Sequence, residues 1–483
     1  MSVSPARLAA FKILLRVQRE ESYASELLHS SLTDSLRESD LRLATELVFG
    51  TLRQQRLLDH LLAPCSAKAL TKLDAEVLAT LRLGAYQLLF LQRVPRRAAV
   101  HESVELVKAA RLKSATGFVN AVLRKVASSD SEMTRKIFDE PMPSALSVRY
   151  SHPEWLVERW LARLGREKVV QLLVHNNRVP KVYFRINAPD LTSDELSTTL
   201  ASQGVRFRTH TLSNDVFEVS EGNLYETTLF RERRIAVQDA GSQLVPHLLD
   251  LTATDVCLDM CAGVGGKSSQ IARLKDSPSP VFALDLHWHR LQVARRLHSQ
   301  NWKNLRWVTC DATRPLPFLR LFDKILVDAP CSGTGTLQRR PEIRWRLRAE
   351  QIRHFQRLQL ALLEIALQHL RPGGTIVYST CSLEPEENEA VVDSFLKAHA
   401  DTSLAIPEGA SMQRLFSPAS FLTFFPPETE TDGFFAAIIR KSDSDHATTE
   451  TRRRRERNSE RSFIFALPTN QNVGTPGSNS QNQ

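Results

Sequence analysis

Apolar residues recur at helical spacing through the first part of the chain. In LAAFKILLRV, LRLATELVFGTLRQQRLLDHLL, AEVLATLRLGAYQLLFL and FVNAVLRKV they repeat every three or four positions, so that one face of a helix would be apolar. Pro95 and Gly117 interrupt this run, and we expect turns between helices there. The pattern predicts a compact all-α domain at residues 1–140.

A second pattern begins after Pro141 and Pro143, which mark a boundary. Residues 144–180 have helical spacing again. VYFRINA and VRFRTHTL, in contrast, are typical of strands, and a helical segment, SDELSTTLASQG, lies between them. A strand–helix–strand order predicts a small α+β module. We therefore assign residues 141–235 to a helical linker followed by this module.

Short apolar runs alternate with amphipathic segments from Val256 onward. DVCLDM, PVFALDL, LRWVTCDA, DKILVDAP and GTIVYST are typical of strands, whereas GKSSQIARLK, HRLQVARRLHSQ and QIRHFQRLQLALLEIALQHL are typical of helices. Such alternation predicts a parallel, doubly wound, Rossmann-like α/β sheet. We place this domain at residues 236–441, so that the whole chain is a multi-domain protein with an all-α, a small α+β and an α/β part.

The last residues, 442–483, differ from everything before them. TTETRRRRERNSERS is a cluster of charges, and NQNVGTPGSNSQNQ is polar and of low complexity. Neither stretch can bury enough apolar surface to offset its ordering entropy, so we expect a disordered basic and polar tail.

Composition restricts the class of protein. Hydrophobic residues make up 42% and charged residues 24% of the 483, as in ordinary globular proteins. No apolar run approaches the roughly 20 residues that span a bilayer, and the N-terminus resembles an amphipathic helix more than an export signal. Six cysteines without a CxxC pair do not make a disulfide framework, and no histidine pair near Cys257 and Cys261 completes a zinc site. We expect a cytoplasmic protein with no membrane segment and no metal.

The net charge of +9 is unevenly distributed. Residues 1–140 carry +5, and residues 82–125 hold nine basic and two acidic residues. A local field of this sign suits a polyanion such as RNA, and it is equally typical of a solvated basic face without a partner.

Polar residues follow the first three strands of the predicted α/β sheet. Asp259 ends the first strand and is followed by a glycine-rich turn, CAGVGGK, that fits neither the P-loop nor the GxGxxG spacing. Asp285 ends the second strand and could accept both hydroxyls of a ribose; Asp311 ends the third and could receive an adenine amino group. Each acid alone is more often a helix cap, but together they indicate a pocket for an adenosine-type cofactor.

Two cysteines follow the fourth and fifth strands. Asp328 ends the fourth, with Cys331 shortly after it, and Cys381 follows the fifth. The carboxyl ends of parallel strands meet at one edge of a doubly wound sheet, so both thiols should lie beside the cofactor. Buried cysteine is usually inert, but two thiols at this place suit methylation of cytosine C5. A thiolate that adds to C6 makes C5 nucleophilic enough to attack a methyl sulfonium.

The segments DMCAGVGGK, DAPCSGTG and YSTCSLEPEENE resemble motifs of the bacterial small-subunit (16S) rRNA cytosine-C5 methyltransferases, the Sun/Fmu branch of the NOL1/NOP2/Sun family. ATELVFGTLR, VPRRAAVHESVELVKAA and GFVNAVLRK resemble the N-terminal domain of that branch, which is itself similar to the NusB antitermination factor. FRINAP, VQDAGSQL and TDGFFAA also resemble segments of the family. The resemblance covers the chain from Pro5 to about Arg440.

This resemblance implies S-adenosylmethionine as cofactor and RNA, most of all small-subunit rRNA, as partner of a monomeric enzyme. It implies that Cys381 is the nucleophile, that Cys331 assists release, and that Asp328 lies by the target base and the methionine end of the cofactor. Asp285 would bind the ribose and Asp311 the adenine. The cofactor loop would consist of Cys261, Ala262, Gly263, Val264, Gly265, Gly266 and Lys267. The family usually has CAAPGGK here, so Gly263 and Val264 make this turn less rigid.

An arginine-rich segment lies downstream of Cys331. Residues 338–357 hold seven arginines and two glutamates, with Trp345 among them. The position beside the predicted site favours an RNA contact with Trp345 as a stacking surface; the alternative is a solvated helix whose tryptophan packs inward.

Other functions remain open at this point. A DNA cytosine methyltransferase would use the Pro330-Cys331 thiol as nucleophile, although the second cysteine and the helical domain disfavour it. An N-methyltransferase would leave both cysteines unexplained. An RNA-binding ribosome-assembly factor would not need them, and a relative of the family could act on tRNA or another RNA.

Overall fold

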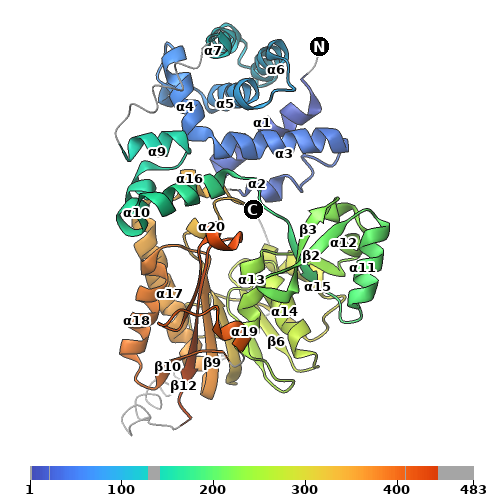
Figure 1. Cartoon of the computed structure of the whole chain (residues 1–483), viewed down its shortest axis with the longest axis vertical. Coiled ribbons are helices and arrows are strands. Elements are labelled where there is room, and N and C mark those ends of the chain that lie inside the picture. The colour runs from blue at the N-terminus through green and yellow to red at the C-terminus, as the bar shows by residue number, and fades with distance from the viewer. Residues whose placement is uncertain (1–2, 21, 129–141, 408–409, 444–483) are drawn as a thin grey trace, which may run out of the picture. The chain divides into compact units, whose positions relative to one another are not determined.

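The structure, a computed structural model, describes residues 3–20, 22–128, 142–407 and 410–443 (Figure 1). Residues 1–441 form one compact unit and residues 442–483 a second. Only Ser442 and Asp443 of the second unit are described, so the predicted disorder of the tail falls outside the described residues. Within the described ranges, no helix has both the length and the apolar character needed to cross a membrane.

The N-terminal part is all-α, as predicted. Its α-helices are α1 (Pro5–Glu20), α2 (Ala24–Leu27), α3 (Glu38–Arg53), α4 (Gln55–Leu62), α5 (Ala75–Phe90), α6 (Arg96–Ala109) and α7 (Thr116–Ser128). Their apolar faces meet in one core that contains Ile13, Leu47, Leu83 and Leu123. Helices α3 and α5 come close because Gly50 has no side chain: a Cβ there would lie 2.0 Å from the Tyr86 ring.

The two predicted breaks in this helical run differ in outcome. Pro95 directly precedes α6, as expected for a residue that cannot continue a helix. The prediction for Gly117 is wrong, because this residue lies in the first turn of α7. The chain reverses earlier, where Arg111 has a φ of 64° and a short 3₁₀ turn, Lys113–Ala115, follows. Pro141 lies outside the described residues, and Pro143 precedes the next helix.

The middle part is a helical linker and a small antiparallel sheet. The linker consists of α9 (Ser144–Arg149) and α10 (Glu154–Asn177), and Gly165, with a φ of 76°, interrupts α10. The sheet has the order β2-β3-β1-β4, and helices α11 and α12 belong to the same module. The elements are β1 (Tyr183–Ile186), α11 (Ser193–Ser202), β2 (Arg206–His210), β3 (Ser213–Glu221), α12 (Thr228–Arg231) and β4 (Ile235–Val237).

The C-terminal part is built on an eight-stranded sheet. Seven strands have the order β10-β12-β9-β8-β5-β6-β7, and β11 pairs with β12. The strands are β5 (Cys257–Asp259), β6 (Val281–Asp285), β7 (Leu305–Thr309), β8 (Phe322–Asp328), β9 (Leu370–Thr380), β10 (Thr402–Ala405), β11 (Phe421–Phe424) and β12 (Phe434–Lys441). The main helices are α13 (Ala240–Leu244), α14 (Gly266–Lys275), α15 (Trp288–His298), α17 (Ala349–His369) and α18 (Glu389–Ala398).

The five predicted strands are the parallel ones, β5 to β9, and the predicted doubly wound α/β fold is confirmed. The strand order reverses between β5 and β8, so a crevice is expected at the carboxyl ends of these two strands. The sheet continues beyond β9 with β12, which is antiparallel to it. The predicted cofactor-binding acids and both cysteines lie at, or shortly after, the carboxyl ends of these parallel strands.

Candidate active site

The glycine-rich turn between β5 and α14 is held by Asp259. This buried carboxylate accepts hydrogen bonds from Cys261 N at 3.3 Å and Ser268 Oγ at 2.6 Å. Burial raises the pKa of Asp259 to about 7. Gly265 has a φ of 82°, and a Cβ there would lie 2.7 Å from the Trp307 ring, so only glycine fits. The turn is therefore fixed by packing although Gly263 and Val264 replace the stiffer family residues.

The next side chain along the turn reaches the fourth parallel strand. Lys267 Nζ donates to Asp328 Oδ2 at 2.7 Å, and Ser379 Oγ of the neighbouring strand donates to Asp328 Oδ1 at 2.8 Å. Lys267 Nζ also lies 5.4 Å from the centre of the Phe434 ring. The carboxylate of Asp328 is thus held in one orientation by an ammonium and a hydroxyl, at the crevice where β5 and β8 end.

A cavity of about 780 Å³ opens at this crevice. It is lined by the turn residues Cys261 to Val264 with Lys267 and Asp328, by residues of the small α+β module, and by Arg339 and Arg340. Binding sites for small molecules and cofactors have volumes of about 300–1,000 Å³. The cavity therefore has room for a cofactor of the size of S-adenosylmethionine.

The other two predicted cofactor residues lie at the same edge of the sheet but do not line this cavity. Asp285 is nearly buried, and it accepts hydrogen bonds from Gly263 N at 3.0 Å and His287 N at 2.7 Å. Asp311 accepts from Thr313 N at 3.0 Å and Thr313 Oγ1 at 2.6 Å. Both carboxylates thus bind the backbone of the turn that follows their strand, which is the structural role that an acid at the end of a strand usually has. Each bound oxygen of Asp285 keeps a lone pair that a ribose hydroxyl could use.

The two cysteines meet beyond Asp328. Cys331 Sγ and Cys381 Sγ are 3.2 Å apart, and all six cysteines are free thiols. The hydrogen bond to Cys381, together with burial, raises the pKa of Cys331 well above its ordinary value. The raised pKa favours the protonated form of Cys331, and either sulfur can be the donor in the contact between the two thiols. The sequence predicts both thiols at the carboxyl edge of the parallel sheet, and in the structure they are in direct contact.

A buried carboxylate that the sequence analysis did not single out joins the two cysteine loops. Glu387 accepts from Ser332 N at 2.8 Å and from Ser382 Oγ at 2.8 Å, the residues that directly follow Cys331 and Cys381. Gln359 of α17 donates to the same carboxylate at 3.1 Å. Burial raises the pKa of Glu387. Glu387 belongs to the EPEENE motif, which lies shortly after Cys381 and Ser382. A carboxylate that is buried in such a loop needs hydrogen-bond donors, so the motif indicated a carboxylate that joins neighbouring loops.

Backbone contacts bring a third segment against Cys381. Gly335 N donates to Cys381 O at 2.9 Å, and Gly433 N donates to Gly335 O at 2.8 Å. A Cβ on Gly335 would lie 2.3 Å from Gly433 O and 2.8 Å from Cys381 O. The close approach of these three backbones therefore requires glycine at position 335, and it explains the glycine of the TDGFFAA segment.

Two acids from distant segments hold Arg339 in the cavity wall. Arg339 donates to Asp239 Oδ2 at 3.0 Å and to Asp432 Oδ1 at 3.2 Å. Burial and the nearby Asp239 raise the pKa of Asp432 to about 7. Asp239 belongs to VQDAGSQL and Asp432 to TDGFFAA, so these family segments serve to attach the cavity wall to the rest of the domain.

The interpretation of Trp345 as a stacking surface for RNA is wrong. Its Nε1 donates to Leu52 O of α3 at 2.8 Å, and the neighbouring Arg344 is fully buried. The segment around them, which includes the short helix α16 (Ile343–Arg346), packs against the N-terminal helices (Figure 1). The inward-packing alternative holds for Trp345, whose ring nitrogen is used within the chain. Arg353 and Arg357, further along the arginine-rich segment, are exposed on α17 (Ala349–His369).

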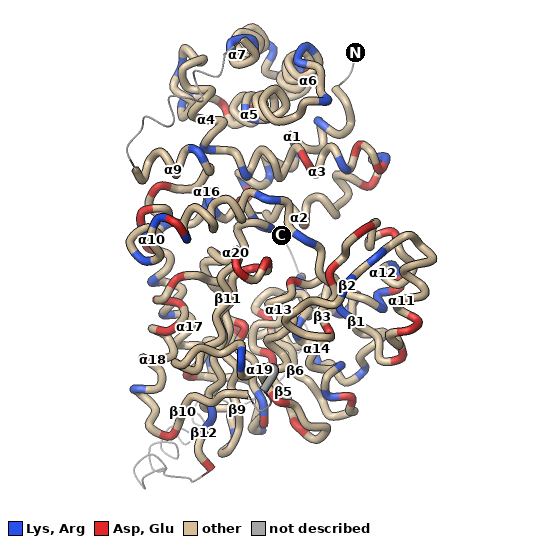
Figure 2. The backbone as a smooth tube through the Cα atoms, in the orientation of Figure 1, with Lys and Arg blue, Asp and Glu red and all other residues tan. Residues whose placement is uncertain are grey.

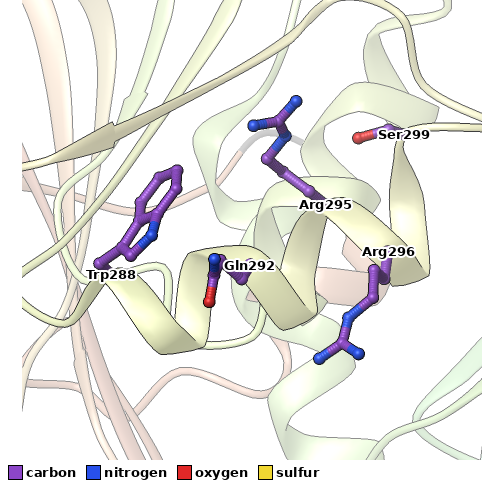
Figure 3. Close-up of a pocket in the computed structure, with 5 residues that line it drawn as sticks. All are labelled: Trp288, Gln292, Arg295, Arg296 and Ser299. Carbon is purple, nitrogen blue, oxygen red and sulfur yellow. The ribbon is translucent and has the colours of Figure 1, made fainter.

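A hollow of about 570 Å³ lies against α15 (Figure 3). It is lined by Trp288, Gln292, Arg295, Arg296 and Ser299. None of the site residues described above lines it, so it is separate from the cysteine pair. The described residues contain no group of three or more histidine, cysteine, aspartate or glutamate side chains that could hold a metal ion.

Comparison with known proteins assigns all three parts of the chain. Residues 246–440 match the family described as 16S rRNA methyltransferase RsmB/F, residues 4–128 match the NusB family, and residues 152–223 match a ferredoxin-like domain of RsmF/B-like methyltransferases.

Full-length relatives agree with this assignment. The chain is 32% identical to the "Probable ribosomal RNA small subunit methyltransferase B" of Bacillus subtilis (strain 168), over 91% of this chain and 100% of that protein. It is 32% identical to ribosomal RNA small subunit methyltransferase B of Escherichia coli O6:K15:H31, over 85% of this chain and 93% of that protein.

Solved structures show the same fold. The crystal structure of PH0851 has a TM-score of 0.79 at 23% identity and covers 91% of this chain and 100% of its own. That of a methyltransferase homologue from Pyrococcus horikoshii has a TM-score of 0.53 at 28% identity, over 61% of this chain and 97% of its own. The chain thus belongs to the RsmB/F family of 16S rRNA methyltransferases and is an rRNA (cytosine-C5) methyltransferase with an N-terminal NusB-family domain.

Proposed function

We propose that the enzyme transfers a methyl group from S-adenosylmethionine to C5 of a cytosine in 16S rRNA through a covalent bond between Cys381 and C6. The observation that carries this proposal is the 3.2 Å contact between the two thiols at the carboxyl ends of β8 and β9. Burial and the hydrogen bond to Cys381 raise the pKa of Cys331, which disfavours its thiolate and so disfavours Cys331 as the attacking group.

The residues around the cavity fit the cofactor. The N–H groups of Cys261 and Gly263 already bind Asp259 and Asp285, so those at the start of α14 would face the cofactor. Asp285 and Asp311, at the same edge of the sheet beside the cavity, would bind its ribose and its adenine ring. Leu286 and Val264, beside these groups, leave 59% and 48% of their surface exposed, as expected of side chains that an adenine ring would cover. When bound, S-adenosylmethionine supplies an electrophilic methyl group.

The chain's own residues account for the other steps. The Cys381 thiolate adds to C6 of the cytosine, which makes C5 nucleophilic; C5 would then bond to the methyl carbon while the bond between that carbon and the sulfonium sulfur breaks, its electron pair staying on sulfur. A base or a water molecule removes the C5 proton, the C5–C6 double bond re-forms, and Cys381 leaves as thiolate. The Cys331 thiol, 3.2 Å away, stabilises that leaving sulfur by a hydrogen bond. Asp328, whose carboxylate forms a salt bridge with Lys267, would orient the target cytosine.

Trapping of the covalent intermediate tests these roles. Cys381→Ala should abolish methylation and form no adduct, whereas Cys331→Ala should attack, transfer the methyl group and then stall as a protein–RNA conjugate. Denaturing electrophoresis after incubation with RNA and cofactor detects the conjugate. Cys310 is a free thiol that follows β7, away from the pair, so Cys310→Ala is the matched control and should behave as wild type.

The reverse pattern, with a conjugate only for Cys381→Ala, would make Cys331 the nucleophile, as in a DNA cytosine methyltransferase. The target base must leave the RNA stack, so unpaired cytosines should form the conjugate best. Mapping of 5-methylcytosine in RNA from cells with and without the gene decides between 16S rRNA and tRNA as the substrate.

We further assign RNA binding to a groove on the NusB-family domain. The groove has a volume of about 910 Å³ and lies between α6 and α7, which carry several Lys and Arg residues (Figure 2). Arg97 and Lys108 of α6 and Arg124 of α7 line it and are exposed, and Gly117 opens one end because nothing lies within 4 Å of where its Cβ would be. Cations on both sides of a groove suit a phosphodiester backbone.

Charge reversal tests this assignment. Arg97→Glu with Arg124→Glu should weaken RNA binding and reduce its dependence on salt, because each lost phosphate contact on a single strand lowers the slope of log K against log salt by about 0.7. Arg37 is exposed and lies outside the groove, so Arg37→Glu is the matched control. Equal salt slopes for the two variants would remove the groove from the RNA-binding surface.

A further inference from the structure

The segment that follows Cys331 ends in side chains that form hydrogen bonds with the N-terminal domain. Arg344 lies at its centre and is 1% exposed. Its guanidinium donates to Arg53 O of α3 at 3.2 Å, to Ser151 O at 3.1 Å and to Asn176 O of α10 at 2.7 Å. Two further bonds go to Leu337 O and the Asn177 side chain. One buried cation thus joins the N-terminal domain, the linker and the catalytic domain.

The neighbours of Arg344 bind the same domain at its helix ends. Trp345 Nε1 donates to Leu52 O, and Arg346 donates to Val17 O at 2.6 Å and Ser22 O at 2.5 Å. Leu52 and Val17 lie in the last turns of α3 and α1, whose carbonyl groups have no partner within the helix. Cations near such carbonyls are also favoured by the helix dipole.

The acidic residue of the segment makes the complementary contact. Glu342 is 1% exposed and its Oε1 accepts a hydrogen bond from Ala24 N, the first residue of α2, at 3.0 Å. Tyr23, just before it, lies under two cations of the segment: the guanidinium carbons of Arg340 and Arg346 are 4.8 Å and 5.9 Å from the centre of its ring. The segment and the N-terminal domain therefore match in charge as well as in shape.

The other end of the same segment touches the nucleophile loop. Gly335 N donates to Cys381 O at 2.9 Å, and Thr334 Oγ1 accepts from Leu383 N at 2.9 Å. Thr336, Arg339 and Arg340 of the segment also line the 780 Å³ cavity. Only a few residues separate these contacts from the hydrogen bonds that Arg344 to Arg346 make with α1 and α3. A displacement of the segment at the N-terminal domain would therefore also displace it at the Cys381 loop.

We propose that the NusB-family domain is a structural part of the active site: through Glu342, Arg344 and Arg346 it holds the segment 334–346 that fixes Cys331 against Cys381. These three are positioning residues, because they touch neither cofactor nor base. Removal of the NusB-family domain would therefore loosen the cysteine pair as well as remove the proposed RNA-binding groove. The inference rests on the proposed roles of the two cysteines.

The test compares two arginines that both join the N-terminal domain to the rest of the chain. Arg346→Met keeps the length of a partly exposed side chain and removes its bonds to Val17 and Ser22. Arg56→Met is the matched control, because Arg56 contacts Glu154 of α10 at 2.8 Å and no residue of the segment. In the full-length protein, with saturating RNA and cofactor, we expect Arg346→Met to lower the single-turnover rate roughly tenfold to hundredfold with little change in KM.

A second readout does not depend on methyl transfer. Alkylation of the intact protein by iodoacetamide, followed residue by residue by mass spectrometry, reports how well the thiols are held. We expect faster modification of Cys331 and Cys381 in Arg346→Met and an unchanged rate at Cys310. Equal rates and equal alkylation for the Arg346 and Arg56 variants would overturn the inference. A wrong assignment of the nucleophile would alter the trapping experiment but not this alkylation pattern.

Discussion

The close approach of three backbones at Gly335 permits a quantitative prediction for Gly335→Ala. A Cβ would lie 2.3 Å from Gly433 O and 2.8 Å from Cys381 O, so the segments must separate by roughly 1 Å before the methyl group fits. The two hydrogen bonds between these segments, of 2.9 Å and 2.8 Å, would then be lost. At about 1 kcal/mol for each bond and 1–3 kcal/mol for overpacking, the variant should lose about 3–5 kcal/mol.

The rate should fall as well, because Cys381 moves with its own carbonyl group. A displacement of about 1 Å costs on the order of a hundredfold in rate. Urea unfolding and single-turnover methyl transfer measure the two effects. Gly117→Ala is the control for stability: nothing lies within 4 Å of its Cβ position and the residue is helical, so alanine should stabilise by about 0.5–1 kcal/mol. A Gly335→Ala protein with wild-type midpoint and rate would refute the described contact between these backbones.

Further predictions concern Asp285, Asp259 and the C-terminal residues. Asp285→Ala should weaken S-adenosylmethionine binding without unfolding the domain, and calorimetry that shows wild-type affinity would remove Asp285 from the cofactor site. Asp259 has a pKa of about 7 in the folded protein against an ordinary 3.8, so the stability that its proton contributes is present below about pH 4 and is lost as the pH rises to 7. The free energy of unfolding should therefore fall more steeply between about pH 4 and pH 7 for wild type than for Asp259→Asn. The same pH dependence in both proteins would contradict the raised pKa of Asp259. Deletion of residues 445–483, which lie outside the described part, should leave the single-turnover rate unchanged; a large fall would show that the tail takes part in catalysis.

Local patterns were sufficient to predict the three kinds of fold and the meeting of the thiols. Strands β5 to β9 are short apolar runs, and the residues after them share one edge because parallel strands all point the same way. The edge position of Cys331 and Cys381 therefore follows from the strand assignment alone. The α-helical periodicity of the N-terminal part was equally direct.

Features that depend on distant partners could not be predicted. Trp345 and Arg344 stand in a charged stretch that is typical of a solvent-exposed or RNA-binding surface, and only the carbonyl groups of α3 and α10 make it an internal one. In the same way β3 is too polar to be recognised as a strand without its neighbours in the sheet. The acids that hold Arg339 come from segments far apart in sequence, so no local spacing reveals them.

The last folded strand has a consequence for how the enzyme is made. Strand β12 pairs with β9 from Thr375 to Thr380, directly before Cys381, and Gly433, which precedes β12, donates to the backbone of Gly335. On the ribosome the N-terminal domain emerges early and can fold first, with the carbonyl groups that receive Arg344 and Arg346 already in place. The strand that leads to Cys381 remains an unpaired edge until residue 441 has emerged. A nascent chain therefore completes its catalytic site only at the end of synthesis of residues 1–441, and premature termination leaves a protein without the paired thiols in place.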